Sequence, residues 1–342
     1  MINRRNFIKT GAFAGISMLA SKHMYAFNPQ ENVKKGLRVG IIGLDTSHST
    51  AFTKLLNTDE AMEYGGYKVV AAYPHGSRDI ESSVKRIPGY IEDVKKQGVQ
   101  ITGSIKELLD QTDVILLETN DGRLHLEQAL EVFKAGKTVF IDKPVAASLS
   151  DAIAIYQAAE KYKVPVFSAS SLRYMSNMDD ILINQSIGKV LGADTFSPCV
   201  LEQTHPDFFW YGIHGIEALY TVMGIGCKTV SRVHTPDTDV VTGLWEDNRI
   251  GTFRGLRAGK TGYGGYAFGE KGIKIMGDYN GYAPLLKDII KFFQTGVSPV
   301  SPKETLEIFT FMEAAHESTR RMGASVELKE VWEKALAKVS LG

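Results

Sequence analysis

The chain has 342 residues, 44% of them hydrophobic, which is enough to form the cores of two domains of ordinary size. Lysine plus arginine and aspartate plus glutamate both number 39, so the formal net charge is zero. This balance argues against nucleic acid or an anionic membrane surface as the partner, because both attract strongly basic proteins. Cys199 and Cys227 lack the CxxC spacing of a zinc site. We expect buried free thiols, although an oxidising compartment would allow the two to pair.

The first 27 residues are predicted to be a targeting segment. Arg4 and Arg5 precede a mildly apolar run over 11–20, which is too short for a membrane span of about 20 residues. Twin arginines before a short apolar region are typical of an export signal, and the segment resembles the twin-arginine (Tat) consensus. We therefore expect a periplasmic protein with no membrane anchor after processing. A frayed basic N-terminus is the alternative.

Residues 36–170 alternate between strand and helix patterns. A β-branched run at 37–42 ends in Gly43, and a Ser/Thr-rich turn then opens a helix with apolar residues at helical spacing. Further strands are predicted over 68–73, 113–118, 138–141 and 164–168, and helices over 105–110, 124–135 and 151–162. We expect Ser150 to cap the last of these helices. This alternation predicts an α/β, doubly wound parallel sheet that binds ligands beyond the carboxyl ends of its strands.

Residues 171–342 are predicted to form a second domain of the α+β class. Apolar segments between glycine-rich turns, over 240–244, 250–255 and 273–276, indicate an open and largely antiparallel sheet. Helices are expected near Tyr211–Val222, over 282–296 and over 302–322. The stretch GYGGYAFG over 262–269 is interpreted as a flexible aromatic loop, with ordinary strand connections as the alternative.

Three segments carry motifs that occur together in one known family. The first is GKTVFIDKP over 136–144, which looks like the signature AGKHVxxEKP; Thr119-Asn120 with His125 is similar to a preceding TPNxxH loop. The tail, with AAHES and then VEL, is similar to a closing helix and last strand. These motifs resemble those of the glucose–fructose oxidoreductase/inositol dehydrogenase (Gfo/Idh/MocA) family over 36–330. The resemblance implies a Rossmann-like first domain, NAD or NADP, a carbohydrate or cyclitol substrate, and homo-oligomers formed through the second domain's sheet.

The dinucleotide fingerprint G-x-G-x-x-G is incomplete. With Gly43 as its first glycine, Asp45 takes the second position and His48 the third. A carboxylate is unfavourable where phosphate approaches bare backbone, and Pro74 stands where an acid would bind the ribose. Asp45 is also a plausible helix N-cap, and with His48 it is an alternative contact for substrate or metal.

Hydroxyl groups in the same turn partly compensate, because a helix N-terminus with hydroxyl donors suits an anion. We expect NAD or NADP to be held by Gly43, Asp45, Thr46, Ser47, His48, Thr119, Asn120 and Lys143. The periplasm offers no free nicotinamide pool, so an exported enzyme needs its cofactor tightly bound.

Lys143 and His214 are the candidate catalytic residues. Lys143 precedes Pro144 at the end of a strand, where the X-Pro restriction holds it extended and directs its ammonium over the sheet edge. By resemblance it contacts the nicotinamide ribose and the substrate hydroxyl. His214 matches the histidine of the family's D-x-G-x-H helix and is the expected general acid/base, with a core histidine as the alternative. Trp210 replaces that motif's aspartate.

The segment over 200–220 is rich in side chains that suit a substrate pocket. We expect the substrate to contact Trp210, Glu217, His205 and Arg173. Glu202, His205, His214 and Glu217 have the residue types of a divalent metal site. They lack tight ligand spacing, so we expect a polar cleft wall and no metal.

The leading hypothesis is an exported, NAD(P)-dependent oxidoreductase of a carbohydrate or cyclitol hydroxyl. A non-redox lyase, epimerase or hydrolase on the same scaffold, with or without metal, is the first alternative, which the incomplete fingerprint favours. A catalytically inactive sugar-binding protein is the second, and the presence of both Lys143 and His214 argues against it.

Overall fold

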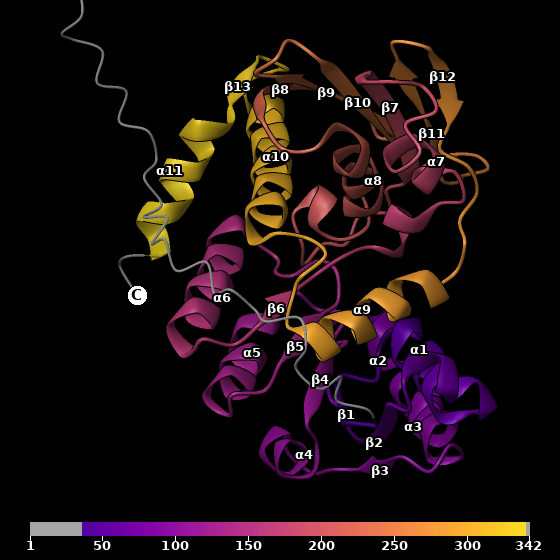
Figure 1. The fold of residues 1–342 in the computed structure, drawn as a ribbon. Helices are drawn as coiled ribbons and strands as arrows, with labels where there is room; N and C mark the ends of the chain where they lie inside the picture. Colours follow the sequence, from indigo (N-terminus) through magenta and orange to yellow (C-terminus); the bar gives the residue numbers. More distant parts are fainter. Residues whose placement is uncertain (1–35, 340–342) are drawn as a thin grey trace, which may run out of the picture. The chain divides into compact units, whose positions relative to one another are not determined.

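The β-branched segments of the N-terminal region form one parallel sheet. In the computed structural model, which describes residues 36–339, six strands lie in the order β3-β2-β1-β4-β5-β6 (Figure 1). They are β1 (Arg38–Ile42), β2 (Lys68–Tyr73), β3 (Gln100–Ile101), β4 (Val114–Leu117), β5 (Val139–Ile141) and β6 (Val166–Phe167). Because β1 pairs in parallel with β2 on one side and β4 on the other, the strand order reverses there. This is the doubly wound Rossmann arrangement, whose ligand crevice lies beyond the carboxyl end of β1.

Helices connect these strands. They are α1 (Ser47–Asn57), α2 (Glu81–Val84), α3 (Ile87–Lys95), α4 (Ile105–Gln111), α5 (His125–Lys134) and α6 (Leu149–Tyr162), with the 3₁₀ helix η1 (Asp59–Tyr64). The prediction that Ser150 caps α6 is wrong. Ser148 is the N-cap, because its backbone is extended and its side chain accepts the N–H of Asp151, whereas Ser150 already lies within the helix. The predicted export signal over 1–27 lies outside the described residues.

The C-terminal region forms a second, mixed sheet. Within the described chain its order is β12-β11-β7-β10-β9-β8-β13, antiparallel throughout except between β7 and β10 (Figure 1). Its strands are β7 (Val190–Pro198), β8 (Cys227–His234), β9 (Thr238–Trp245), β10 (Ile250–Leu256), β11 (Gly264–Gly269), β12 (Gly272–Ile275) and β13 (Val326–Glu327). The predicted flexible loop over 262–269 is wrong, because most of it is β11. A Cβ at Gly265 would lie 2.5 Å from the carbonyl oxygen of Asp194, so glycine lets this strand approach β7.

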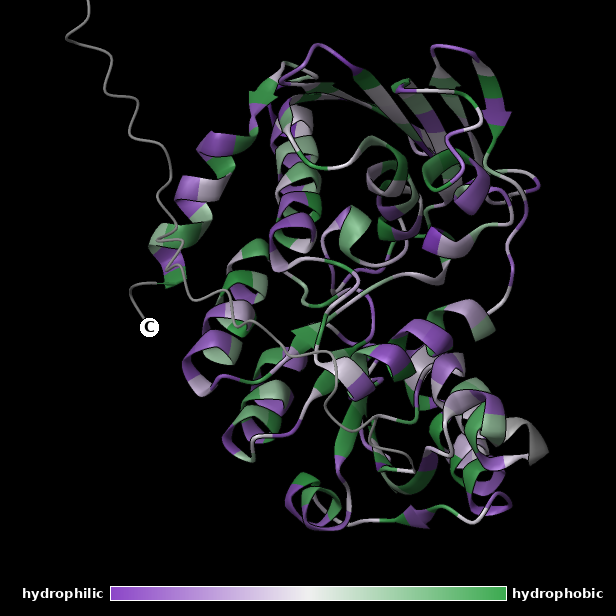
Figure 2. Cartoon of the chain, in the orientation of Figure 1, coloured by the Kyte–Doolittle hydropathy of each residue, from purple (hydrophilic) through white to green (hydrophobic). Residues whose placement is uncertain are grey.

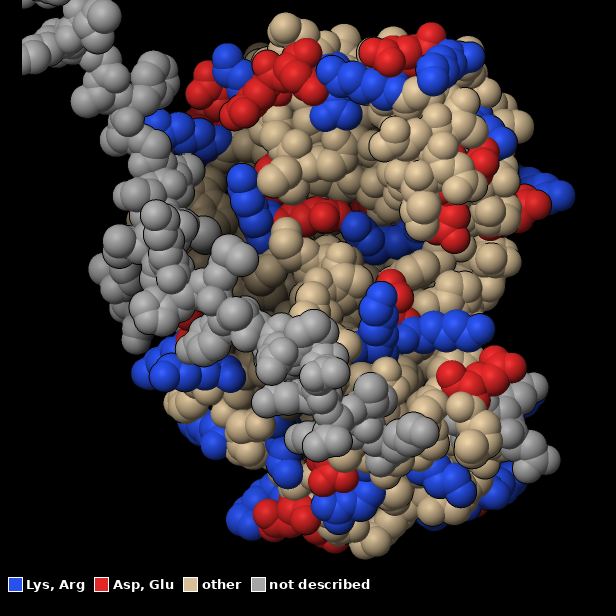
Figure 3. Space-filling view, in the orientation of Figure 1, with Lys and Arg blue, Asp and Glu red and all other residues tan. Residues whose placement is uncertain are grey.

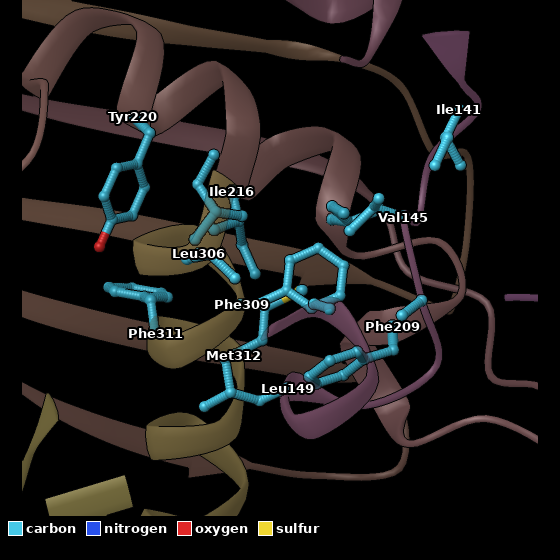
Figure 4. Packing of buried hydrophobic residues seen from close by; sticks show 14 of the residues in the cluster. Ile141, Val145, Leu149, Phe209, Ile216, Tyr220, Leu306, Phe309, Phe311 and Met312 are labelled. Atoms are coloured by element: carbon cyan, nitrogen blue, oxygen red, sulfur yellow. The ribbon is translucent and has the colours of Figure 1, made fainter. Parts of the chain in front are cut away.

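The helices of this region lie between the two sheets and along their sides. They are α7 (Met178–Leu182), α8 (Ile213–Met223), α9 (Ala283–Thr295), α10 (Pro302–Arg320) and α11 (Leu328–Val339), with η2 (Ser171–Tyr174) and η3 (Asp207–Phe209). In Figure 4, Ile216 and Tyr220 of α8 pack against Phe309 and Phe311 of α10, and Leu149 of α6 belongs to the same buried cluster. The hydrophobic core therefore continues from one sheet to the other.

Helix α9 returns to the N-terminal sheet. Leu285, Ile289 and Phe292 are buried with Val39 of β1 and Phe52 of α1, and Figure 1 shows α9 beside α1. This packing brings Tyr282, the residue before α9, to the N-terminus of α1. The domain boundary near residue 170 stays a prediction, since segments on both sides of it share cores.

The surface agrees with the balanced composition. Hydrophobic residues concentrate on the strands and on the helix faces that pack against them (Figure 2). On the face shown in Figure 3, positive and negative side chains are interspersed. None of the described helices is both long and apolar enough to cross a bilayer. Cys199 and Cys227 are both free and buried, as predicted.

Candidate active site

A pocket of about 410 Å³ lies beyond the carboxyl ends of β1, β4 and β5. The N-terminal region contributes Thr46, Ser47, His48, Ser82, Arg86, Asn120 and Lys143. The C-terminal region contributes Ser171, Leu172, Val200, Trp210, Tyr211, His214, Tyr263, Tyr279 and Tyr282. The pocket therefore brings together both predicted catalytic residues and most of the predicted helix-turn residues.

The N-terminus of α1 opens into this pocket. Thr46 is the N-cap, with an extended backbone, and its hydroxyl accepts the N–H of His48 at 3.5 Å. The prediction that Asp45 caps this helix is therefore wrong. Ser47 exposes its hydroxyl 3.1 Å from that of Tyr282. Hydroxyl donors at the positive end of a helix dipole make this corner suitable for a phosphate group.

Gly43 fixes the turn between β1 and α1. Its φ is +90°, and a Cβ there would lie 2.5 Å from the backbone nitrogen of Thr119. No other residue allows the turn to approach the loop after β4 so closely. This is the role expected of the first fingerprint glycine.

The Asp45 carboxylate is turned into the loops and away from the pocket. It is fully buried and accepts the N–H of Ser77 at 2.8 Å and the N–H of Asn120 at 2.9 Å. Burial raises the pKa of Asp45 to about 6, against the opposing effect of these two hydrogen bonds. Asp45 thus ties the loop after β2 to the loop after β4, across the end of β1.

Further polar contacts join the same two loops. Asn120 donates from its side chain to the hydroxyl of Ser83 at 2.9 Å, and Arg123 donates to Asp79 at 3.1 Å and to Asp121 at 2.9 Å. The two loops therefore cover the carboxyl end of β1. The pocket lies beside them, at the N-terminus of α1 and at Lys143.

Lys143 lies at the base of the pocket beside a cluster of acids. It is 7% exposed, and among the described residues its ammonium has no hydrogen-bond partner. Asp142 accepts the backbone N–H of Lys143 at 2.8 Å and lies 2.9 Å from His48 Nδ1. Burial opposes ionisation of Asp142, but the charges of His48 and Lys143 bring its pKa to about 2.

Glu118 completes this cluster. It is fully buried, and Oε2 lies 3.7 Å from His48 Nδ1. Burial and the charge of Asp142 raise the pKa of Glu118 well above its ordinary value. Glu118 was not among the predicted site residues; its only signal in the sequence is an acid at the carboxyl end of a buried strand.

His214 faces the pocket from the first turn of α8. Its Nδ1 lies 2.7 Å from the hydroxyl of Ser170, and the backbone N–H of Ser170 donates to Glu217 at 2.8 Å. His214 and Glu217 thus share a helix face, as predicted. Burial and the charge of Lys143 hold the pKa of His214 well below its usual range, so the imidazole is neutral.

Four tyrosines, Tyr211, Tyr263, Tyr279 and Tyr282, form one wall of the pocket. The hydroxyls of Tyr211 and Tyr263 lie 3.2 Å apart, and the ring of Tyr279 lies 6.0 Å from those of Tyr263 and Tyr282. Such a wall offers both apolar ring faces and hydroxyl groups to a ligand. The sequence analysis noted the aromatic stretch 262–269 but not Tyr279 or Tyr282, which the return of α9 brings to the pocket.

A family model matches one segment in the first half of this chain. Residues 37–170 match the family model GFO_IDH_MocA, described as "Oxidoreductase family, NAD-binding Rossmann fold". Residues 37–170 belong to the Gfo/Idh/MocA family. The predicted family is therefore confirmed, and so is its two-part fold.

A curated enzyme is similar to part of this chain. Over 160 residues it is 25% identical to glucose-6-phosphate 3-dehydrogenase of Bacillus subtilis (strain 168). That match covers 45% of this chain and 40% of the enzyme, so it spans less than half of the curated relative's length.

Solved structures extend the likeness over the described fold. Scyllo-inositol dehydrogenase from Lactobacillus casei, with bound NAD(H) and scyllo-inositol, has a TM-score of 0.71 and 16% identity, covering 86% of this chain and 100% of its own. Myo-inositol 2-dehydrogenase from Lactobacillus plantarum has a TM-score of 0.67 and 16% identity, covering 86% of this chain and 99% of its own. At these identities the likeness establishes the shared fold.

Several predicted residues of this Gfo/Idh/MocA site lie outside the pocket lining. They are Gly43, Asp45, Thr119, His205, Glu217 and Arg173. Arg173 is buried and pairs with Glu304 and, at 3.4 Å, with Glu217. Burial raises the pKa of Glu217 to about 7, and Arg173 opposes this shift. The Arg173–Glu217 pair therefore contacts the backbone of Ser170 and does not line the pocket.

The four side chains considered as a metal site are not brought together. His205 Nε2 lies 3.5 Å from Asp121, its ring lies 5.0 Å from that of Trp210, and burial lowers its pKa to about 4. Glu202 accepts the N–H of Thr204 at 3.3 Å, and His214 contacts Ser170. His205 therefore supports Trp210, which does line the pocket.

Proposed function

We propose that this protein is an NAD(P)-dependent oxidoreductase that acts on a hydroxyl group of a carbohydrate or cyclitol. The observation that carries the proposal is that Lys143 and His214, which come from different sheets, line one pocket beside the N-terminus of α1. Both side chains would then act on one substrate hydroxyl bound in this pocket. The sugar and inositol dehydrogenases named above support the substrate class.

The donor set at the pocket fits a nicotinamide nucleotide. Thr46 and Ser47 offer hydroxyls at the helix N-terminus for a phosphate, while Asn120 and Lys143 offer donors for ribose oxygens. Phosphate would thus be bound by the helix end and its hydroxyls, since the Asp45 carboxylate faces the loops. When bound, the nucleotide would supply the hydride acceptor. Either NAD or NADP meets this donor set.

The protein's own contribution is to handle the hydroxyl proton. In the tautomer in which Nδ1–H of His214 donates to the Ser170 hydroxyl, Nε2 is free to accept the proton as a general base. The neutral state of His214 suits that role. Lys143 stabilises the negative charge that develops on the substrate oxygen, because its ammonium is desolvated and unpaired among the described residues.

Turnover of a sugar panel tests the proposal. Purified protein is incubated with NAD⁺ or NADP⁺ and a set of hexoses, sugar phosphates and inositols, and the near-ultraviolet absorbance of the reduced nucleotide is followed. Lys143→Met should lower kcat by about 10²–10⁴-fold. The matched control is Lys134→Met, an exposed lysine in the last turn of α5, which should keep the wild-type rate. Equal rates for Lys143→Met and the wild type would contradict the proposed chemistry.

A non-redox reaction at the same pocket is the second candidate. It is favoured by the closure of the loops after β2 and β4 over β1, where Asp45 replaces the second fingerprint glycine. Conversion of a sugar without nucleotide, abolished by Lys143→Met, would select it. Sugar binding without conversion would select an inactive binding protein.

The proposal includes export and tight cofactor retention. The twin-arginine segment, which includes Arg4 and Arg5, supports a periplasmic location. A periplasmic enzyme would keep its nucleotide bound and regenerate it on a second substrate. Replacement of both arginines by lysine should trap the protein in the cytoplasm, as followed by cell fractionation.

We also propose a homo-oligomer formed through the outer face of the second sheet. Ile250 of β10, Ile273 and Ile275 of β12, and Leu191 of β7 are about half or more exposed on that sheet. Exposed apolar side chains that gather on one face favour association. Ile250→Asp should shift the mass measured by light scattering towards the monomer.

A further inference from the structure

Three buried side chains of metal-ligand type meet beneath the pocket. His48 Nδ1 lies 2.9 Å from Asp142 Oδ1 and 3.7 Å from Glu118 Oε2. One ligand atom from each residue lies within 4.8 Å of the other two. His48 lies in the first turn of α1, whereas Glu118 and Asp142 directly follow β4 and β5. The cluster is therefore held by the edge of the parallel sheet and not by a loop tip.

The protein satisfies only one of the four carboxylate oxygens of this cluster. Glu118 and Asp142 are both 0% exposed. Among the described residues, neither oxygen of Glu118 has a hydrogen-bond partner, and neither has Oδ2 of Asp142. Buried oxygens without partners are rare because the lost hydration is not replaced. A cation held between the three side chains would replace it.

We propose that His48, Glu118 and Asp142 bind a divalent first-row transition metal ion, of which Zn²⁺ is the probe. Ligand atoms about 2.0–2.2 Å from a zinc ion and about 90–120° apart lie about 2.8–3.8 Å from one another. The two measured distances from His48 Nδ1 fall within this range. One imidazole and two carboxylates suit Zn²⁺, Mn²⁺ or Fe²⁺ better than Ca²⁺, which prefers oxygen ligands alone.

The proposed ion would act next to the catalytic lysine. Three protein ligands leave a fourth position for water or for a ligand atom. His48 lines the pocket together with Lys143, and Lys143 follows Asp142 in the chain. The site differs from the residues Glu202, His205, His214 and Glu217, which the structure leaves apart. It also stands independently of the nucleotide, because metal content is measured without turnover.

Metal titration of the whole chain tests this site. Protein stripped with a chelator is titrated with Zn²⁺ by calorimetry, and the retained metal is counted by mass spectrometry after gel filtration. We expect one tightly held ion per chain. Replacement of Zn²⁺ by Co²⁺ should give visible absorption bands of a low-coordinate site with nitrogen and oxygen ligands. Zn²⁺ should also raise the melting temperature, because it binds only the folded state.

Glu118→Gln is the decisive variant, since it keeps the shape of the side chain and removes its charge. We expect about tenfold or greater loss of Zn²⁺ affinity, with loss of the melting-temperature increase. Circular dichroism checks the fold, and His48→Gln is the second variant with the same expected loss. The matched control is Glu202→Gln, an acid outside the cluster, which should bind as the wild type does.

Three outcomes would overturn the proposal. They are a wild-type chain that retains no Zn²⁺, folded variants of Glu118 and His48 that bind it undiminished, and a Glu202→Gln loss equal to that of Glu118→Gln. None of these outcomes depends on whether the protein oxidises a sugar.

Discussion

Removal of the Asp45 carboxylate should destabilise the protein by an amount that the structure sets. Asp45→Ala leaves the buried N–H groups of Ser77 and Asn120 without an acceptor. Each buried N–H without an acceptor lowers the free energy of unfolding by about 1–3 kcal/mol, so the two together should lower it by roughly 2–6 kcal/mol. Asp45→Asn keeps one acceptor oxygen but turns an NH₂ group towards the other N–H, and should cost about 1–3 kcal/mol where the wild-type carboxyl is neutral.

The pH dependence of this difference has a definite sign. The pKa of Asp45 rises from 3.8 to about 6 in the folded state, so between these values the folded chain keeps a proton that the unfolded chain releases. The contribution of Asp45 to the free energy of unfolding is therefore fully present below about pH 4 and is lost as the pH rises through about 6. At about 1.4 kcal/mol per pH unit, the full loss is roughly 3 kcal/mol. The asparagine side chain does not titrate in this range. The difference in free energy of unfolding between the wild type and Asp45→Asn should therefore become smaller as the pH rises.

Urea unfolding at a series of pH values between about 4 and 8 measures both quantities. We expect Asp45→Ala to be less stable than Asp45→Asn at every pH. The difference in free energy of unfolding between Asp45→Asn and the wild type should shrink by about 2–3 kcal/mol across the series. Two results would refute the account of this carboxylate. One is a stability difference between Asp45→Asn and the wild type that stays constant with pH, and the other is an Asp45→Ala variant within about 0.5 kcal/mol of the wild type near pH 4.

Two further substitutions test the packing that positions the site and the second sheet. Gly43→Ala should lower the free energy of unfolding by more than about 2 kcal/mol, because the added Cβ would lie 2.5 Å from the backbone of Thr119. The same substitution should weaken nucleotide binding. Gly136→Ala, also at positive φ but in open space, should cost only about 1 kcal/mol. Arg232→Met should lower the free energy of unfolding by about 1–3 kcal/mol in denaturant unfolding, because the buried Asp239 loses one of its two arginine partners. Arg249→Met removes an ion pair whose acid is exposed, and should change stability by less than about 1 kcal/mol.

The sheet of the N-terminal region was predictable because its buried strands are uninterrupted apolar runs. Strand β2 has the predicted bounds, and β1, β4 and β5 differ by a residue at their ends. Strand β3 has two residues, one of them exposed, and carries no pattern of its own. In the second sheet, β11 is rich in glycine, and composition suggested a loop. Its strand conformation depends on close approach to β7, a long-range contact that the local sequence does not reveal.

The site was predictable where a motif fixes a residue near the end of a strand or the start of a helix. Lys143 and His214 were found in this way, and both line the pocket. Arg173 and Glu217 stay predicted substrate contacts, but they pair with each other outside the pocket lining, and a charged residue in a polar segment gives no sign of such a buried partner. Glu118 was missed because its proximity to His48 arises only when β1 and β4 become neighbours.

The nucleotide content of the purified full-length protein tests the central claim most directly. The protein is denatured, the supernatant is separated, and released NAD(H) and NADP(H) are measured by absorbance and mass spectrometry. The account predicts close to one nicotinamide nucleotide per chain, with a strongly reduced amount from Gly43→Ala. A chain that releases neither nucleotide, and whose melting temperature does not respond to added NAD⁺ or NADP⁺, would contradict it.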